Sequence, residues 1–183
     1  MTYAEYYKAK HEGALIFQDF VVDTVWRLMH IHLIVYGSKA YQFSKGEGPT
    51  AEIKHDELFK QTRRLWIEVA EKAAPRGGPY AVSGIYRQDD TWMWAQGDYD
   101  TIFLFQKLNL RAIHKSGRYN VIENRTFTSE GFLIPERHAT KLAMAVLYPK
   151  AGKVLSEITN DLEELGKLLH AAMLKDPNQG ELL

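Results

Sequence analysis

The sequence predicts an α/β domain followed by a helical C-terminal extension. Three observations support this class: a long amphipathic segment at the start, several alternating segments in the middle, and a leucine-rich stripe near the end. The chain has 183 residues, of which 45% are hydrophobic, so it can bury the core of one ordinary domain. We expect that domain in residues 1–150, and a C-terminal helix in residues 151–183 that packs on it or forms a homodimer contact.

The composition excludes several classes of protein. The 23 Lys and Arg residues balance the 23 Asp and Glu residues, so bulk charge alone does not explain binding to nucleic acid. The chain contains no cysteine, which excludes disulfides, thiolate metal sites and a cysteine nucleophile and indicates a reducing cytoplasm. The longest apolar stretch, residues 14–36, carries Asp19, Asp23 and Arg27, which is too much charge for a membrane span. We therefore expect a cytoplasmic protein with no membrane partner.

The first thirty residues predict one amphipathic helix. Phe17, Val21 and Val25 recur at intervals of four and Leu28 follows three residues later, so these side chains share one face. Asp19 lies on a different face. After the helix, the β-branched run at residues 33–36 predicts a first strand, and the glycines and proline in the stretch 45–49 predict a turn.

Two further strands are predicted at residues 50–56 and 64–72, because apolar and polar residues alternate in each. The polar row of the first strand is Glu52, Lys54 and Asp56, and the apolar row of the second is Leu65, Ile67 and Val69. Glu68 lies on the polar side of the second strand. The six residues 57–62 are enough for a hairpin loop, so we expect the two strands to pair with each other.

The remaining elements follow from the same kinds of signal. We expect strands at residues 91–96, 101–105, 119–122 and 132–134, and helices at 107–115, 135–147 and 154–174. A turn at Gly97-Asp98 joins the first two of these strands, and Gly117 ends the first of these helices. The last helix carries the leucine stripe.

The proposed hairpin brings together residues that can do chemistry. Asp56 near the end of one strand would lie close to Glu68 on the other, and two such carboxylates repel each other unless a cation lies between them. Mg²⁺ suits this arrangement, because it prefers one or two carboxylates together with water and phosphate oxygens. Lys54, on the same face as Asp56, would then orient or deprotonate an attacking water or neutralise a phosphate. The alternative is a solvated strand face held by weak salt bridges, and the number of metal ions stays open.

Several short motifs follow one another between Ile34 and Phe105. They are Tyr41-Gln42, Gly46-Glu47, Glu52-Ile53-Lys54 with Asp56, Ile67-Glu68 and Ser83-Gly84-Ile85. This order resembles the PD-(D/E)XK nuclease superfamily, and in particular its phage-associated and uncharacterised nuclease-like members. The resemblance implies a restriction-endonuclease-like core, in which helices flank a central mixed β-sheet, and a Mg²⁺-dependent endonuclease that cuts DNA.

The resemblance also implies roles for individual residues. Asp56 and Glu68 would be the metal ligands, with Mn²⁺ able to substitute for Mg²⁺, and Lys54 would be their basic partner. Glu47 or Glu52 would act as a secondary ligand or support one. Nucleases of this superfamily often add an acid from a helix to the metal shell. Asp19 and Glu12 are the candidates for that role, and their spacing does not decide between them.

The sequence departs from the superfamily pattern at one position. The pattern has a lysine two residues after the acidic residue, whereas Ala70 stands there in this chain. Either Lys54 supplies the amine from the neighbouring strand, which we favour, or Lys72 supplies it from further along the same strand. The remaining alternative is a catalytically inactive nuclease-fold protein that binds nucleic acid or a protein partner. A third hypothesis is an unrelated α/β domain that assembles through its C-terminal helix.

Basic residues near the proposed site are candidates for contacts with DNA. They are Lys60, Arg63, Arg64 and Arg87, and the backbone and hydroxyl of Ser83 would approach a phosphate. Such contacts would weaken as the salt concentration rises. The alternative is that the basic side chains are solvated and that Gly84 marks a turn.

Two other groups of residues have simpler structural interpretations. His30 and His32 could chelate zinc, but no third ligand follows at a useful spacing. Asp89-Asp90 with Trp92 and Trp94 could hold a cation or stack bases, and we interpret the segment as a turn that leads into a strand with partly buried tryptophans.

Overall fold

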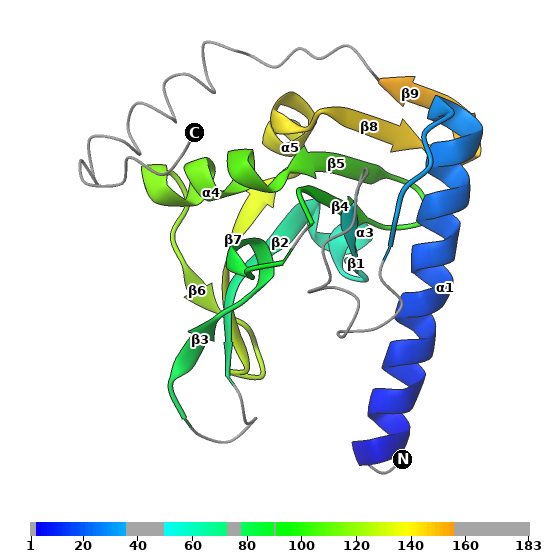
Figure 1. Cartoon of the computed structure of the whole chain (residues 1–183). Coiled ribbons are helices and arrows are strands. Elements are labelled where there is room, and N and C mark those ends of the chain that lie inside the picture. The colour runs from blue at the N-terminus through cyan, green and yellow to red at the C-terminus, as the bar shows by residue number, and fades with distance from the viewer. Residues whose placement is uncertain (1–2, 36–49, 73–77, 90, 156–183) are drawn as a thin grey trace.

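The structure, a computed structural model, describes residues 3–35, 50–72, 78–89 and 91–155. It is an α/β protein with a five-stranded mixed sheet, ordered β1-β4-β5-β8-β9, and a four-stranded antiparallel sheet, ordered β3-β2-β7-β6 (Figure 1). The strands are β1 Ala51–His55, β2 Arg64–Lys72, β3 Tyr80–Val82, β4 Met93–Gly97, β5 Ile102–Gln106, β6 Ile122–Glu123, β7 Ser129–Pro135, β8 Ala145–Tyr148 and β9 Lys153–Leu155. The helices are α1 Tyr3–Met29, α3 Phe59–Thr62, α4 Lys107–Ser116 and α5 Glu136–Leu142, with 3₁₀ turns η1 Gly84–Tyr86 and η2 Pro149–Ala151. The predicted α/β class is confirmed at this level.

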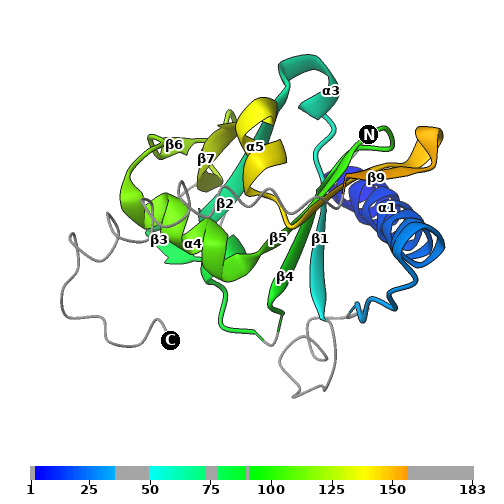
Figure 2. The ribbon, with the colours of Figure 1, turned by 90° about the horizontal axis from the view of Figure 1, so that it is seen from above.

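Helix α1 confirms the amphipathic helix predicted at the start of the chain. Phe17, Val21 and Val25 are fully buried in a cluster that includes Ala51 of β1 and Leu104 of β5. Figure 2 shows α1 alongside β1 and β9. The helix therefore covers the face of the five-stranded sheet to which the apolar row of β1 points.

Strands β4 and β5 form the predicted hairpin. Gly97 has a φ of +155°, and a Cβ added there would lie 2.0 Å from the Thr101 carbonyl oxygen, so only glycine fits this turn. The Asp98 carboxylate accepts hydrogen bonds from the backbone N–H groups of Asp100 and Thr101. Helix α4 follows directly and ends at Gly117, which has a φ of +68°, as predicted.

The predicted pairing of β1 with β2 is wrong. Strand β1 pairs in parallel with β4, whereas β2 pairs antiparallel with β3 and β7 in the other sheet. Between β1 and β2, the short helix α3 and the left-handed backbone of Arg63, with a φ of +52°, redirect the chain. The two strands still meet at one point, where the Asp56 carboxylate accepts a hydrogen bond from the Trp66 backbone N–H at 3.0 Å.

The C-terminal part of the predicted helix at residues 135–147 is also wrong. Helix α5 ends at Leu142, and Ala145, Val146 and Leu147 belong to β8. These three side chains are almost fully buried, since β8 lies between β5 and β9 inside the sheet. A continuous apolar run of this kind fits a buried strand as well as a helix, so periodicity alone does not separate them.

Other predictions also change, some in their boundaries and some in the type of element. Strand β7 is longer than the predicted 132–134, and the predicted 119–122 strand contracts to β6. Val154 and Leu155, predicted as helix, lie in β9, and the rest of that helix lies outside the described residues. Ile34 forms only an isolated bridge to Thr50, and Tyr36 and the 45–49 turn lie outside the described residues. The division into a domain and a C-terminal helix stays a prediction.

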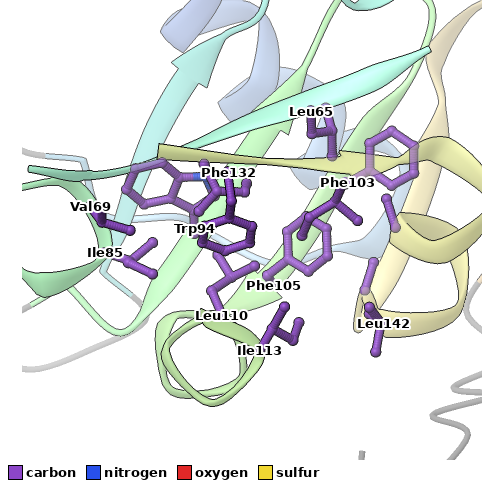
Figure 3. Packing of buried hydrophobic residues seen from close by; sticks show 14 of the residues in the cluster. Leu65, Val69, Ile85, Trp94, Phe103, Phe105, Leu110, Ile113, Phe132 and Leu142 are labelled. Carbon is purple, nitrogen blue, oxygen red and sulfur yellow. The ribbon is translucent and has the colours of Figure 1, made fainter. Parts of the chain in front are cut away.

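The main core lies between the two sheets. Trp94, Phe103 and Phe105 of the five-stranded sheet pack with Ile67 and Phe132 of the four-stranded sheet (Figure 3). Helix α4 adds buried side chains to the same cluster. Since Glu52 is aligned with Trp94 in the parallel β1–β4 register, the polar row of β1 points toward this inter-sheet space. No helix among the described residues is long and apolar enough to span a membrane.

Candidate functional site

The polar row of β1 meets β2 from the other sheet and forms a cluster of charged side chains. We call Glu52, Lys54, Glu68, Ser83 and Arg87 the inter-sheet cluster. The Lys54 ammonium lies 2.9 Å from Glu52 Oε1 and 5.5 Å from the ring centre of Trp94. Its charge also lowers the pKa of Glu68, which places the amine close to an acid from each sheet. The side chain of Lys54 is 35% exposed, so solvent reaches the cluster there.

Glu52 is the most buried acid of the cluster, at 7% exposed. Three cations surround its carboxylate: Lys54 at 2.9 Å, Lys107 at 3.2 Å and Arg87 at 3.5 Å. Glu52 Oε2 nevertheless has no hydrogen-bond partner among the described residues, because Lys107 directs its donors to Asp89 and Thr91. A buried carboxylate oxygen without a hydrogen bond is costly, and the ion pair with the Lys107 ammonium offsets that cost here.

Burial raises the pKa of Glu68 above its ordinary value. The Lys54 charge and a hydrogen bond from Ser83 Oγ, at 2.9 Å, act in the opposite direction and are weaker together than the burial. Ser83 is itself buried, and its Oγ also accepts a hydrogen bond from Arg87 at 3.1 Å. The hydroxyl that we predicted to contact a phosphate therefore bonds to Glu68 and Arg87 in this structure, and its contact with a phosphate stays a prediction.

The Ser83-Gly84-Ile85 motif packs directly on β2. Ser83 donates its backbone N–H to the Val69 carbonyl, and Gly84 has a φ of +54°. A Cβ added at Gly84 would lie 2.1 Å from the Glu68 carbonyl oxygen. Glycine is therefore required by close contact with the strand that carries Glu68, in addition to its role in the turn.

Asp56 lies further along the same inter-sheet contact. Burial raises its pKa, while hydrogen bonds from the Trp66 backbone and the Gln96 side chain lower it. Both bonds are to Oδ2, at 3.0 Å and 3.1 Å, and Gln96 also donates to the Trp66 carbonyl at 2.7 Å. Asp56 thus ties the two sheets together.

The described residues contain no group of three His, Cys, Asp or Glu side chains placed to hold a metal ion. The carboxylates of the cluster that could accept Mg²⁺ are Glu68 and Glu52, whose Oε2 atom lies 3.2 Å from the Lys107 ammonium without a hydrogen bond, and water would complete the shell. Asp19 is exposed on α1, which covers the opposite face of β1, so the structure does not bring it to the cluster. Its rival Glu12 is exposed and lies 4.0 Å from Lys8, and Glu47 lies outside the described residues.

The structure separates most of the predicted DNA-binding residues from the cluster. Lys60 pairs with Asp100 at 3.0 Å, and Arg63 forms two hydrogen bonds with Glu136. Arg64 is exposed at the start of β2. Arg87 alone among the four basic side chains belongs to the cluster, where it also lies 3.7 Å from Glu71.

Lys72, the other candidate amine, points away from the acids of the cluster. Its ammonium lies 3.8 Å from Glu123 and 4.5 Å from the ring centre of Tyr80, near the far end of the four-stranded sheet. Lys54 is therefore the amine that the fold brings beside Glu68.

Lys107 is a central residue that the sequence did not reveal. It begins α4, is only 2% exposed, and contacts Asp89 at 2.8 Å and Thr91 at 2.6 Å as well as Glu52. A lysine at the start of a predicted helix normally lies in solvent, and no spacing signal marked this one as buried. Only the placement of α4 directly after β5, the third strand of the sheet, brings it to Glu52.

Known proteins do not identify the site. No protein family, curated protein or solved structure matches the chain. The resemblance to the PD-(D/E)XK superfamily accordingly stays a prediction from the motifs.

Proposed function

We propose that this protein is a Mg²⁺-dependent nuclease that hydrolyses phosphodiester bonds in DNA, on a core related to restriction endonucleases. One observation supports this proposal above the others: the Lys54 amine lies 2.9 Å from the buried Glu52 carboxylate, and its charge acts on Glu68, an acid of the other sheet whose pKa is raised by burial. An acid whose pKa is perturbed by burial, near a partly exposed cation, is typical of catalytic sites.

We assign the divalent cation to carboxylates at the inter-sheet contact. Glu68 and Glu52 would hold Mg²⁺, or Mn²⁺ in its place, and Asp56 is the other carboxylate of the polar row that begins with Glu52. A bound Mg²⁺ would supply Lewis acidity and lower the pKa of a coordinated water. We assign Glu52 rather than Asp56 as the second metal ligand, because the Asp56 Oδ2 atom already accepts two hydrogen bonds.

The other residues of the cluster have supporting roles in this proposal. Lys54 would hold the attacking water or a phosphate oxygen at its Nζ atom. It would replace the lysine of the superfamily pattern, whose position is occupied by Ala70 in this chain. Ser83 fixes the orientation of Glu68 through its hydrogen bond, and Arg87 balances the charge of Glu52. The negative charge of the cluster is thereby kept low enough for an anionic phosphate to approach.

A cleavage assay tests the proposal. The substrates are linear, circular, single-stranded and four-way-junction DNA, each with Mg²⁺ and with EDTA. We expect cleavage only with Mg²⁺ or Mn²⁺, and a loss of at least about 100-fold in Glu68→Gln and Lys54→Met. Comparing Glu52→Gln with Asp56→Asn shows which acid joins Glu68.

Two exposed residues provide matched controls for these variants. Glu57→Gln and Lys141→Met make the same chemical changes outside the cluster, so both should cut DNA at the wild-type rate. Undiminished cutting by Glu68→Gln and Lys54→Met would refute the proposal.

The second candidate function is an inactive nuclease-fold protein that binds nucleic acid or a protein partner. Ala70 in place of lysine favours it, as does the absence of three converging ligands among the described residues. Calorimetric titration with Mg²⁺ and Mn²⁺ separates the two functions. Heat of binding that disappears in Glu68→Gln supports the nuclease, and no binding of either ion supports the inactive protein.

A further inference from the structure

A cleft of about 420 Å³ lies beside the start of α4, next to the inter-sheet cluster. Its walls come from the segment before β4 and from the first turns of α4, and they include Trp92, Gln106, Lys107, Leu108 and Arg111. This volume is within the range of small-molecule sites and can hold one nucleotide.

The walls combine an exposed aromatic ring with a fixed cation. Trp92 is 43% exposed and Leu108 is 41% exposed, although both are large apolar side chains that usually pack inside. Arg111 donates its Nε–H to the Ile85 carbonyl at 2.6 Å, which holds the guanidinium at the rim. No carboxylate among the described residues forms an ion pair with Arg111. The guanidinium can therefore donate hydrogen bonds from its other N–H groups to an anion.

The cleft is connected to the inter-sheet cluster by a single side chain. Lys107 lines the cleft and is 2% exposed, and its Nζ atom lies 3.2 Å from Glu52 Oε2. Among the described residues that line the cleft, the one acid is Asp89, which lies 2.8 Å from the same amine, so its charge is compensated by Lys107. The cleft and the inter-sheet cluster therefore share Lys107 as a common wall.

We propose that this cleft binds one unpaired nucleotide of single-stranded DNA, with the base stacked on Trp92 and a phosphate held by Arg111. In a duplex, both faces of a base are covered by its neighbours, so only an unpaired or extruded base offers a face to an indole ring. The assignment of DNA as the polymer rests on the proposed function. The cleft then extends that function to substrates that contain a single-stranded segment.

Binding in EDTA tests this assignment without any hydrolysis. Fluorescence anisotropy is measured with a labelled oligothymidylate of about 12 nucleotides and with a hairpin duplex of similar length. Because stacking on an aromatic side chain contributes about 1–3 kcal/mol per base, Trp92→Ala should weaken binding of the single strand roughly tenfold. Binding of the duplex should stay unchanged, and Trp92→Phe should retain most of the wild-type affinity.

Trp26→Ala is the matched control. Trp26 is 44% exposed, as much as Trp92, but it lies on α1. Single-strand affinity should be unchanged in this variant. Equal single-strand binding by wild type and Trp92→Ala, or equal losses for both tryptophan variants, would overturn the assignment of the cleft.

The same proteins assayed with Mg²⁺ distinguish this inference from the proposed function. Loss of single-strand binding in Trp92→Ala without cleavage by the wild type supports the cleft and contradicts the nuclease. Cleavage by the wild type that Trp92→Ala leaves intact on a single strand supports the nuclease and contradicts the cleft.

Discussion

Burial opposes ionisation of two carboxyls where the sheets meet, Asp56 and Glu68. A protein tolerates such groups when they serve binding or catalysis, because replacing them by neutral residues of the same shape removes the cost of a buried charge. The effect of a neutral replacement is easier to predict for Glu68. Its main hydrogen-bond donor is the Ser83 hydroxyl, which would also donate to the carbonyl of a glutamine.

The stability of Glu68→Gln should therefore depend on pH in a defined direction. Since the folded protein raises the pKa of Glu68 above its ordinary 4.5, the folded state binds this proton more tightly than the unfolded state. The wild-type group contributes most to stability below the ordinary pKa, and that contribution is lost as pH rises through the folded pKa. We expect Glu68→Gln to raise Tm by about 2–4 °C at neutral pH, equivalent to roughly 1 kcal/mol, and to give little gain under acidic conditions.

Thermal unfolding followed by circular dichroism at acidic and neutral pH measures this difference. The exposed Glu57→Gln should behave like the wild type at both values. A lower Tm for Glu68→Gln at neutral pH would show that the Lys54 and Ser83 contacts outweigh the burial of the charge.

At the scale of elements, period-2 alternation correctly predicted β1 and β2 but gave no information on their partners. Strand β2 buries the apolar side that we expected, whereas β1 buries Ala51 and also Glu52, which belongs to its polar side. The two strands lie in different sheets, because register and pairing depend on α3 and on β4 and β7 further along the chain. The polar row of β1 faces the inter-sheet space, where Asp56 contacts the backbone of Trp66. The candidate site was thus predictable in its residue types but not in its geometry, and Lys107 was not predictable at all.

The contact between η1 and β2 leads to a prediction at the scale of elements. Gly84→Ala should destabilise the fold by about 2–4 kcal/mol, because its Cβ would overlap the Glu68 backbone and its φ of +54° disfavours alanine. Gly152 is a matched control, since it has a φ of +60° and no atom within 4 Å of an added Cβ. Gly152→Ala should cost only about 1 kcal/mol. Urea unfolding gives both values, and equal losses would mean that backbone conformation alone explains the glycine at position 84.

At the scale of the whole molecule, charge is balanced by local pairing rather than spread over one face. Lys60, Arg63, Lys72, Arg87 and Lys107 all form ion pairs with acids among the described residues. The charges that cancel over the whole sequence therefore also cancel locally at these cations. The balance of charge could be predicted from the composition. Which basic side chains lack an ion pair could not be predicted, because that depends on tertiary contacts such as the one between Arg63 and Glu136.

This compensation predicts a shallow salt dependence for DNA binding. Each phosphate neutralised on a single strand contributes about −0.7 to the slope of log K against log salt concentration, so two or three contacts give roughly −1.5 to −2. Arg111 and Lys54 are the cations that we expect to supply most of that slope, since one has no ion pair with a described acid and the other is partly exposed. Anisotropy titrations in EDTA between about 50 and 200 mM salt measure it. A slope steeper than about −4 would mean that the ion pairs at Lys60, Arg63 and Arg87 open to contact the backbone, and that DNA binds across a wider surface than the cluster and the cleft.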